Sequence, residues 1–120
     1  MTARPNLRLG EWVAVCRLDD IVPDTGVCAL VNGVQVAVFR LSGDGEDGGS
    51  VHAIANFDPF AKANVLSRGI VGDLKGELVV ASPVYKQHFN LVTGQCLEEP
   101  GVRVAAFQAC VQAGTVFVIT

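Results

Sequence analysis

The sequence of 120 residues predicts one all-β domain, an antiparallel β-sandwich or small barrel of short strands and hairpins. Its apolar residues come in short runs that are rich in valine, and residue pairs suited to tight turns separate these runs. Of all residues, 50% are hydrophobic, which is enough to fill a single core. No glycine-rich loop follows a strand and opens a helix, so a nucleotide-binding βαβ unit is not expected.

In the first third of the chain, valine-rich runs predict a strand over 12–16 and a hairpin with strands near 27–31 and 34–41. We expect the hairpin to turn at Asn32-Gly33, because this pair accepts the positive φ angles of a type I′ turn. The second strand of the hairpin is apolar on both faces, so it is expected to lie inside the sandwich.

The remaining elements follow the same pattern. The glycine-rich acidic stretch 43–50 predicts a mobile hairpin loop. Strands are expected over 51–56 and 77–81, and a closing hairpin is expected to turn at 113–114. Only the stretch 59–68 offers a turn or two of helix.

Composition and charge exclude several classes of partner. The formal net charge is −3, so no overall basic field exists to attract nucleic acid or an anionic membrane. No apolar run approaches the roughly 20 residues that span a bilayer. The first residues lack the apolar core of a signal peptide. These features predict a cytoplasmic protein that binds neither nucleic acid nor membrane.

The four cysteines are interpreted as free, buried thiols. They show no C-x-x-C spacing, and nothing in the sequence indicates secretion. The predicted hairpin order keeps their strands apart, so a cluster bound by these cysteines is not expected. They are Cys16, Cys28, Cys96 and Cys110.

No other side chains form a recognisable catalytic or metal-binding pattern. His52 and His88 are interpreted as surface or packing residues, because neither has a cysteine or carboxylate at a recognised ligand spacing. The acidic groups lie in glycine and proline turns, where solvated side chains are expected. Ser67 and Ser82 have no histidine and carboxylate arranged around them as a hydrolase triad requires. The sequence therefore predicts no catalytic residue and no metal ligand in this chain.

The order of features resembles the Rieske domain over nearly the whole chain. The segments that carry the resemblance are the NG hairpin, VHAIAN, FDPF, SPVYKQHFNLVTG and the final GTVFVIT. In Rieske domains two loops, C-P-H and C-P-x-H, hold a [2Fe-2S] cluster through two cysteines and two histidines. Here Asp58 and Ser82 stand at the cysteine positions, and Phe60 and Tyr85 stand at the histidine positions.

The resemblance therefore implies a Rieske-like β-sandwich without its cluster ligands. Phe60 has no donor atom, and Tyr85 is a poor substitute for an imidazole, so a [2Fe-2S] cluster is not expected at these positions. Two arrangements are open for the aromatic rings. They fill the space that the cluster and its ligands leave, or one or both of them are exposed.

A ligand-free Rieske-like domain that contains FDPF, VLSRG and SPVYKQHFNLVTGQCLEEP is similar to the small subunit of the assimilatory NAD(P)H-dependent nitrite reductase. The resemblance covers about residues 9–120. It implies a subunit without a cofactor or bound small-molecule substrate of its own, with a structural or docking role. The implied partner is a large subunit that carries FAD, siroheme and a [4Fe-4S] cluster and reduces nitrite to ammonia in nitrate assimilation.

The resemblance also implies where this chain would dock, because related cluster-bearing domains meet their redox partner at the two loop tips. The expected interface consists of Pro59, Phe60, Lys62, Arg68, Pro83, Tyr85, Lys86, Gln87 and His88. Two alternatives are a Rieske-type, ferredoxin-like electron-transfer component and a stand-alone protein-interaction module. The missing ligand set argues against the first, and the absence of a large reductase partner would favour the second.

Overall fold

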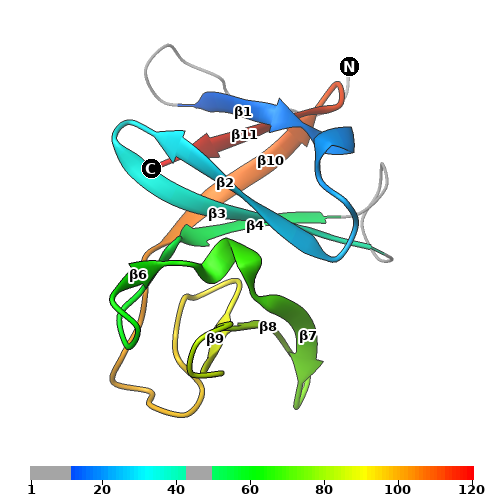
Figure 1. Ribbon diagram of the computed structural model, residues 1–120. Helices are drawn as coiled ribbons and strands as arrows, with labels where there is room; N and C mark the ends of the chain where they lie inside the picture. Colours follow the sequence, from blue (N-terminus) through cyan, green and yellow to red (C-terminus); the bar gives the residue numbers. More distant parts are fainter. Residues whose placement is uncertain (1–11, 43–49) are drawn as a thin grey trace.

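The computed structural model describes residues 12–42 and 50–120. In this part of the chain, a six-stranded antiparallel sheet lies above a smaller lobe that contains a three-stranded sheet and a two-stranded ribbon (Figure 1). The fold is all-β, as the sequence predicts. The helical segments described are single 3-10 turns, so none of them could cross a membrane.

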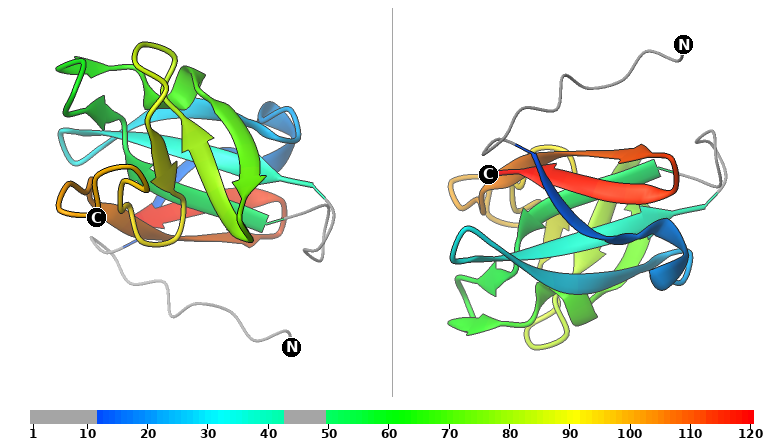
Figure 2. Two further views of the ribbon diagram at one scale, coloured as in Figure 1. Left: turned by 90° about the horizontal axis from the view of Figure 1, so that it is seen from below. Right: turned by 90° about the horizontal axis from the view of Figure 1, so that it is seen from above.

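The large sheet is rolled into a partly closed barrel. In the order of pairing its strands are β1 (Val13–Arg17), β11 (Thr115–Ile119), β10 (Ala106–Gln112), β4 (Ser50–Ala55), β3 (Val34–Leu41) and β2 (Thr25–Val31). Strands β1 and β2 stand at the two ends of this order, yet they contact each other. The view from above shows how the sheet curves to bring these two edges together (Figure 2).

The small lobe follows β4 in the chain. The strands β5 (Phe57–Asp58) and β6 (Ala63–Asn64) form the ribbon, and η3 (Leu66–Arg68) leads into the second sheet. That sheet consists of β7 (Ile70–Leu74), β8 (Glu77–Ala81) and β9 (His88–Asn90). The ribbon and the β8–β9 connection carry the two loops that resemble Rieske ligand loops.

Among the described residues, strand β3 joins two hydrophobic cores. Val36 and Val38 face the core inside the barrel, while Ala37 and Phe39 face a second core between the barrel and the small lobe. The barrel core also includes Leu18, Ile21, Val31, Ala53, Val116 and Val118. The second core also includes Leu41, Ile54, Leu66, Val80, Phe89, Leu91, Cys96 and Val104. The two faces of β3 are therefore both buried, as its apolar residues on both faces predict.

Both predicted hairpin turns are confirmed. Asn32 and Gly33 have φ angles of 50° and 82°, the left-handed values that a type I′ turn requires. Ala113 and Gly114, with φ angles of 52° and 78°, connect β10 to β11 in the same way. The strands expected over 12–16, 27–31, 34–41, 51–56 and 77–81 correspond to β1, β2, β3, β4 and β8.

The prediction that only residues 59–68 offer helix is wrong. That stretch does contain η3, but a second 3-10 turn, η1 (Leu18–Asp20), lies in the predicted acidic turn. The Asp20 carboxylate stabilises η1 by accepting a 2.9 Å hydrogen bond from the Arg17 N–H. Of the predicted loop over 43–50, residues 43–49 lie outside the described residues, and Ser50 begins β4.

Candidate functional site

The first loop is organised by the side chain of Asp58. This residue ends β5 and is fully buried. Its Oδ1 accepts hydrogen bonds from the backbone N–H groups of Phe60, at 2.8 Å, and Ala61, at 3.2 Å. Its carbonyl accepts a third bond, of 2.7 Å, from the Lys62 N–H. Asp58 therefore fixes the backbone of the turn that replaces the C-P-H loop.

The second loop is organised by Ser82, which follows β8 and is also fully buried. Its N–H donates to the Gln87 carbonyl at 2.9 Å, and its carbonyl accepts from the Lys86 N–H at 3.1 Å. The Ser82 hydroxyl oxygen accepts a 3.3 Å bond from the Val84 N–H. These bonds close the base of the loop and leave its tip in solvent.

The structure brings the two former cysteine positions together. The Ser82 hydroxyl donates a hydrogen bond to Oδ2 of Asp58. Since Oδ1 already accepts from the first loop, the carboxylate uses both of its oxygens. The positions that hold thiolates in a Rieske domain here hold a buried polar pair that links one loop to the other.

The two former histidine positions point in different directions. Phe60 is half-buried and packs against Phe89 of the second core, with ring centroids 6.2 Å apart and an interplanar angle of 49°. Tyr85 is 61% exposed. Thus one ring fills the interior and the other projects from the loop tip.

The residues at these four positions do not fit a [2Fe-2S] cluster. The Phe60 ring offers no donor atom, and the oxygens of Asp58 and Ser82 are engaged with each other and with loop N–H groups. Tyr85 lies largely in solvent. Across residues 12–42 and 50–120, no group of three or more His, Cys, Asp or Glu side chains is arranged to hold a metal ion.

Asn56 supports the first loop and was not singled out from the sequence. It is buried directly after β4, and its backbone N–H donates to the Gln35 carbonyl at 3.0 Å. Its side-chain Nδ2 donates to Gln35 Oε1 at 3.2 Å, and its Oδ1 accepts from the Ser67 N–H at 2.7 Å. The signal in the sequence is an asparagine that ends an apolar strand directly before FDPF.

The cysteines are free, but the prediction that all of them are buried is wrong. Cys96 is buried in the second core, whereas Cys28 is exposed on the edge strand β2. Burial raises the pKa of the Cys16, Cys96 and Cys110 thiols, and the Asp20 carboxylate raises that of Cys16 further. These three thiols are therefore poor nucleophiles.

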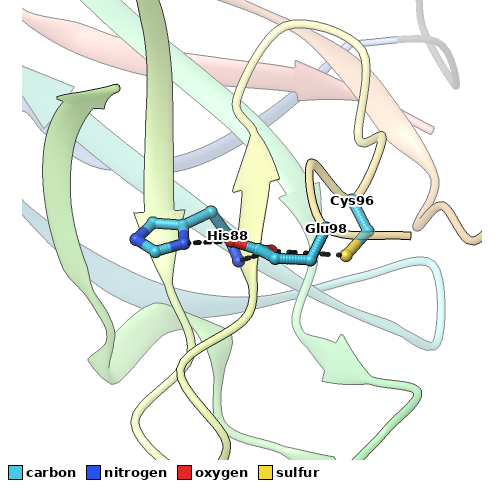
Figure 3. Close-up of polar contacts among 3 residues, drawn as sticks. All are labelled: His88, Cys96 and Glu98. Carbon is cyan, nitrogen blue, oxygen red and sulfur yellow. Dashed lines mark hydrogen bonds and ion pairs between the residues drawn. The ribbon is translucent and has the colours of Figure 1, made fainter. Parts of the chain in front are cut away.

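His88 has a carboxylate partner that sequence spacing did not reveal. Its Nδ1 lies 2.6 Å from Glu98 Oε2, and its backbone N–H donates to Glu98 Oε1 at 2.8 Å (Figure 3). The Cys96 thiol donates to the same Oε1 at 3.7 Å. Burial alone would raise the pKa of Glu98, but the hydrogen bonds from His88 outweigh it and hold this pKa below its ordinary value. The chain brings these residues together because the Leu97 N–H donates to the His88 carbonyl at 2.9 Å.

His52 is a packing residue, as expected. It lies half-buried on β4, with Nε2 3.4 Å from the Ser50 hydroxyl. Burial lowers the pKa of its imidazole. The neutral ring is thus favoured at this position.

All nine residues of the expected interface remain at least partly accessible. Five are exposed: Lys62, Arg68, Pro83, Tyr85 and Lys86. Four are half-buried: Pro59, Phe60, Gln87 and His88. Val84 at the tip of the second loop is also exposed, and so is Phe57 in strand β5, which leads into the first loop.

Two linked loops on a small lobe, below a rolled six-stranded sheet, define a Rieske-like domain. In agreement with this class, the model of the Rieske-like [2Fe-2S] domain family matches residues 11–119. The nitrite reductase (NADH) small subunit of Salmonella typhimurium is 46% identical over 108 residues, which are 90% of this chain and 96% of that one. The solved structure of an NADH-dependent nitrite reductase small subunit from Mycobacterium tuberculosis is also 46% identical, with a TM-score of 0.83. That match covers 91% of this chain and 94% of the other.

A third relative is the NAD(P)H nitrite reductase large subunit of Klebsiella oxytoca, which is 39% identical over 114 residues. The match takes in 95% of this chain but 11% of that protein. The chain belongs to the Rieske-like domain family and, within it, to the nitrite reductase small subunits.

Proposed function

We propose that this chain is the non-redox small subunit of a cytoplasmic NAD(P)H-dependent nitrite reductase and that it docks on the large subunit through its two loop tips. Membership of the small-subunit family supports the assignment to this complex. The poor fit of the four loop positions to a [2Fe-2S] cluster supports a role without electron transfer. In this proposal the large subunit reduces nitrite, and it carries the FAD, siroheme and [4Fe-4S] cluster that the family resemblance implies.

The Klebsiella oxytoca large subunit supports the choice of partner. A segment of that protein corresponds to 95% of this chain, so in that organism one polypeptide contains both a domain like this one and the rest of a large subunit. A separate small chain that takes the same position must bind the large subunit by non-covalent contacts, because no peptide bond holds it there. A permanent docking surface on this chain is therefore expected.

The exposed Tyr85 is the observation that carries the docking proposal. A tyrosine that is 61% exposed leaves a large apolar ring in solvent, and such rings are common anchors of protein interfaces. Val84, the neighbour of Tyr85 in the chain, is exposed as well, and Lys62 and Lys86 are exposed cations in the first and second loop. Although the chain as a whole carries a net charge of −3, these two lysines place positive charge at the loops. They favour an acidic surface on the large subunit.

Binding of the purified chain to the purified large subunit tests the proposal. We expect Tyr85→Ala to weaken association by about tenfold or more, as loss of an anchoring ring does at other interfaces. Val22→Ala, which shortens an exposed apolar side chain outside the two loops, should leave the dissociation constant unchanged.

Other results would redirect the proposal. A folded Tyr85→Ala variant with wild-type affinity would show that the loop tips are not the docking surface. Failure of the wild-type chain to bind the large subunit at all would favour a stand-alone interaction module.

A further inference from the structure

We infer that the buried hydrogen bond between Asp58 and Ser82 replaces a cluster as the link between the two loops, and that it positions the tips for docking. This inference rests on the docking function proposed above. It makes Asp58 and Ser82 positioning residues, because neither reaches the surface that a partner would touch.

The location of the pair makes the link effective. Asp58 ends β5 and Ser82 follows β8, so the bond joins segments that are 24 residues apart in the sequence. Both side chains are fully buried, which excludes competing water and strengthens the bond. Loss of the Ser82 hydroxyl would leave one carboxylate oxygen buried without its donor, and such an oxygen is costly.

The pair also holds the backbone of each loop. In the first loop, Asp58 Oδ1 accepts from the N–H groups of Phe60 and Ala61. In the second loop, the Ser82 hydroxyl oxygen accepts from the N–H of Val84, next to Tyr85. A continuous chain of hydrogen bonds therefore runs from the tip of one loop, through two buried side chains, to the tip of the other. Breaking its central bond should loosen both tips together.

Amide hydrogen exchange of the full chain, read by NMR, tests this link without the partner. In Ser82→Ala we expect exchange at Phe60, Ala61 and Val84 to become about tenfold faster or more, as for loss of a hydrogen bond to a charged group. Ser82→Thr keeps the hydroxyl and should retain slow exchange at Phe60 and Ala61. Thr93→Val is the matched control, because it removes a hydroxyl from the neighbouring turn, where the oxygen accepts from the Gln95 N–H at 3.2 Å.

Affinity for the large subunit tests the positioning role. Ser82→Ala should weaken association by about tenfold, since loosened tips must be ordered on binding. If Ser82→Ala does not fold, the Asp58→Asn/Ser82→Ala double variant removes the buried charge and is measured in its place.

The outcomes separate this inference from the docking function. Wild-type exchange at Phe60 and Ala61 in Ser82→Ala would overturn the link even if Val84 exchanges faster, because the Val84 N–H loses its own acceptor in this variant. Faster exchange at Phe60 and Ala61 with unchanged affinity would overturn the positioning role. In either case a weakened Tyr85→Ala variant would leave the docking function standing. Unchanged affinity in both Tyr85→Ala and Ser82→Ala would overturn the docking function together with the positioning role.

Discussion

At the scale of single residues, Phe60 and Tyr85 show how equivalent loop positions acquire different roles. Phe60 enters the second core and meets Phe89, so its ring contributes hydrophobic burial. Tyr85 lies at the tip of a loop whose base is closed by Ser82, so its ring stays in solvent. The first ring therefore serves stability, and the second is available for binding.

Substitution of each ring by alanine separates these roles. Phe60→Ala should lower the free energy of unfolding by about 2 kcal/mol, less than for a fully buried phenylalanine. Tyr85→Ala should change it by no more than about 0.5 kcal/mol, because the ring is mainly solvated. Urea unfolding followed by circular dichroism measures both values. Equal destabilisation by the two substitutions would contradict the assignment.

The pair of His88 and Glu98 should contribute a pH-dependent stability. The pKa of Glu98 is lower in the folded chain than its ordinary value of 4.5, so the contribution is present above that pH and is lost as pH falls through the folded pKa. Glu98→Gln should therefore be less stable than wild type at pH 7, and the difference should shrink as pH falls below 4.5 and through the lowered pKa of the folded chain.

The size of this effect is limited because the Glu98 side chain is 43% exposed. We expect at most about 1 kcal/mol at pH 7. Urea unfolding at a series of pH values measures it, with Glu99→Gln as the control on the adjacent exposed residue. A difference between wild type and Glu98→Gln that does not decrease at all as pH falls from 7 to below 4.5 would contradict this assignment.

How far the sequence predicts the site depends on the kind of feature. The positions of Asp58 and Ser82 within their loops could be predicted, because the flanking prolines and aromatics keep the pattern of a Rieske loop. The bond between them could not be predicted, because it depends on how the ribbon packs against the small sheet. The contact of His88 with Glu98 could not be predicted either, because it depends on how the chain turns back between these two residues.

At the scale of elements, turn chemistry was the most predictable feature. Asn32-Gly33 determines the β2–β3 hairpin locally, so neither position needs tertiary contacts to adopt its positive φ. The 3-10 turn η1 was missed because its stability comes from a hydrogen bond between Asp20 and the Arg17 backbone, and many solvated acidic turns share that composition.

Comparison of two glycines with nearly the same φ separates the cost of backbone strain from the cost of steric crowding by the rest of the fold. Gly94 has φ +81°, and a Cβ there would lie 2.0 Å from the Val104 carbonyl oxygen. Gly33 has φ +82°, but a Cβ there would meet nothing within 4 Å. Gly94→Ala should cost at least about 3 kcal/mol of unfolding free energy, whereas Gly33→Ala should cost about 1–2 kcal/mol.

Thermal or urea unfolding of the two glycine variants measures this contrast. The Gly94 turn packs on the chain that returns towards β10, where the Val104 N–H donates to the Gly94 carbonyl at 2.9 Å. A crowded Gly94→Ala should therefore also disturb the segment that leads back to the barrel. Equal costs for the two substitutions would show that φ alone determines them.

At the scale of the whole molecule, two cores share strand β3, and the small lobe that carries the two loops lies below the barrel (Figure 1). In a cluster-bearing domain of this class, metal ligands would join the loops. Here Asp58 and Ser82 form a buried hydrogen bond between the loops, and the half-buried Phe60 ring packs against Phe89 of the second core. The fold thus keeps its loops together by packing and hydrogen bonding, which supports the proposed role without electron transfer.

Iron and acid-labile sulfide analysis of the folded chain, purified without oxygen and recorded with its visible spectrum, decides whether this chain carries a cluster. We expect a colourless protein with less than about one tenth of an iron atom per chain, because none of the four positions that correspond to cluster ligands offers a thiolate or an imidazole. A brown protein with stoichiometric iron and sulfide would contradict it, and the electron-carrier function would then have to be restored.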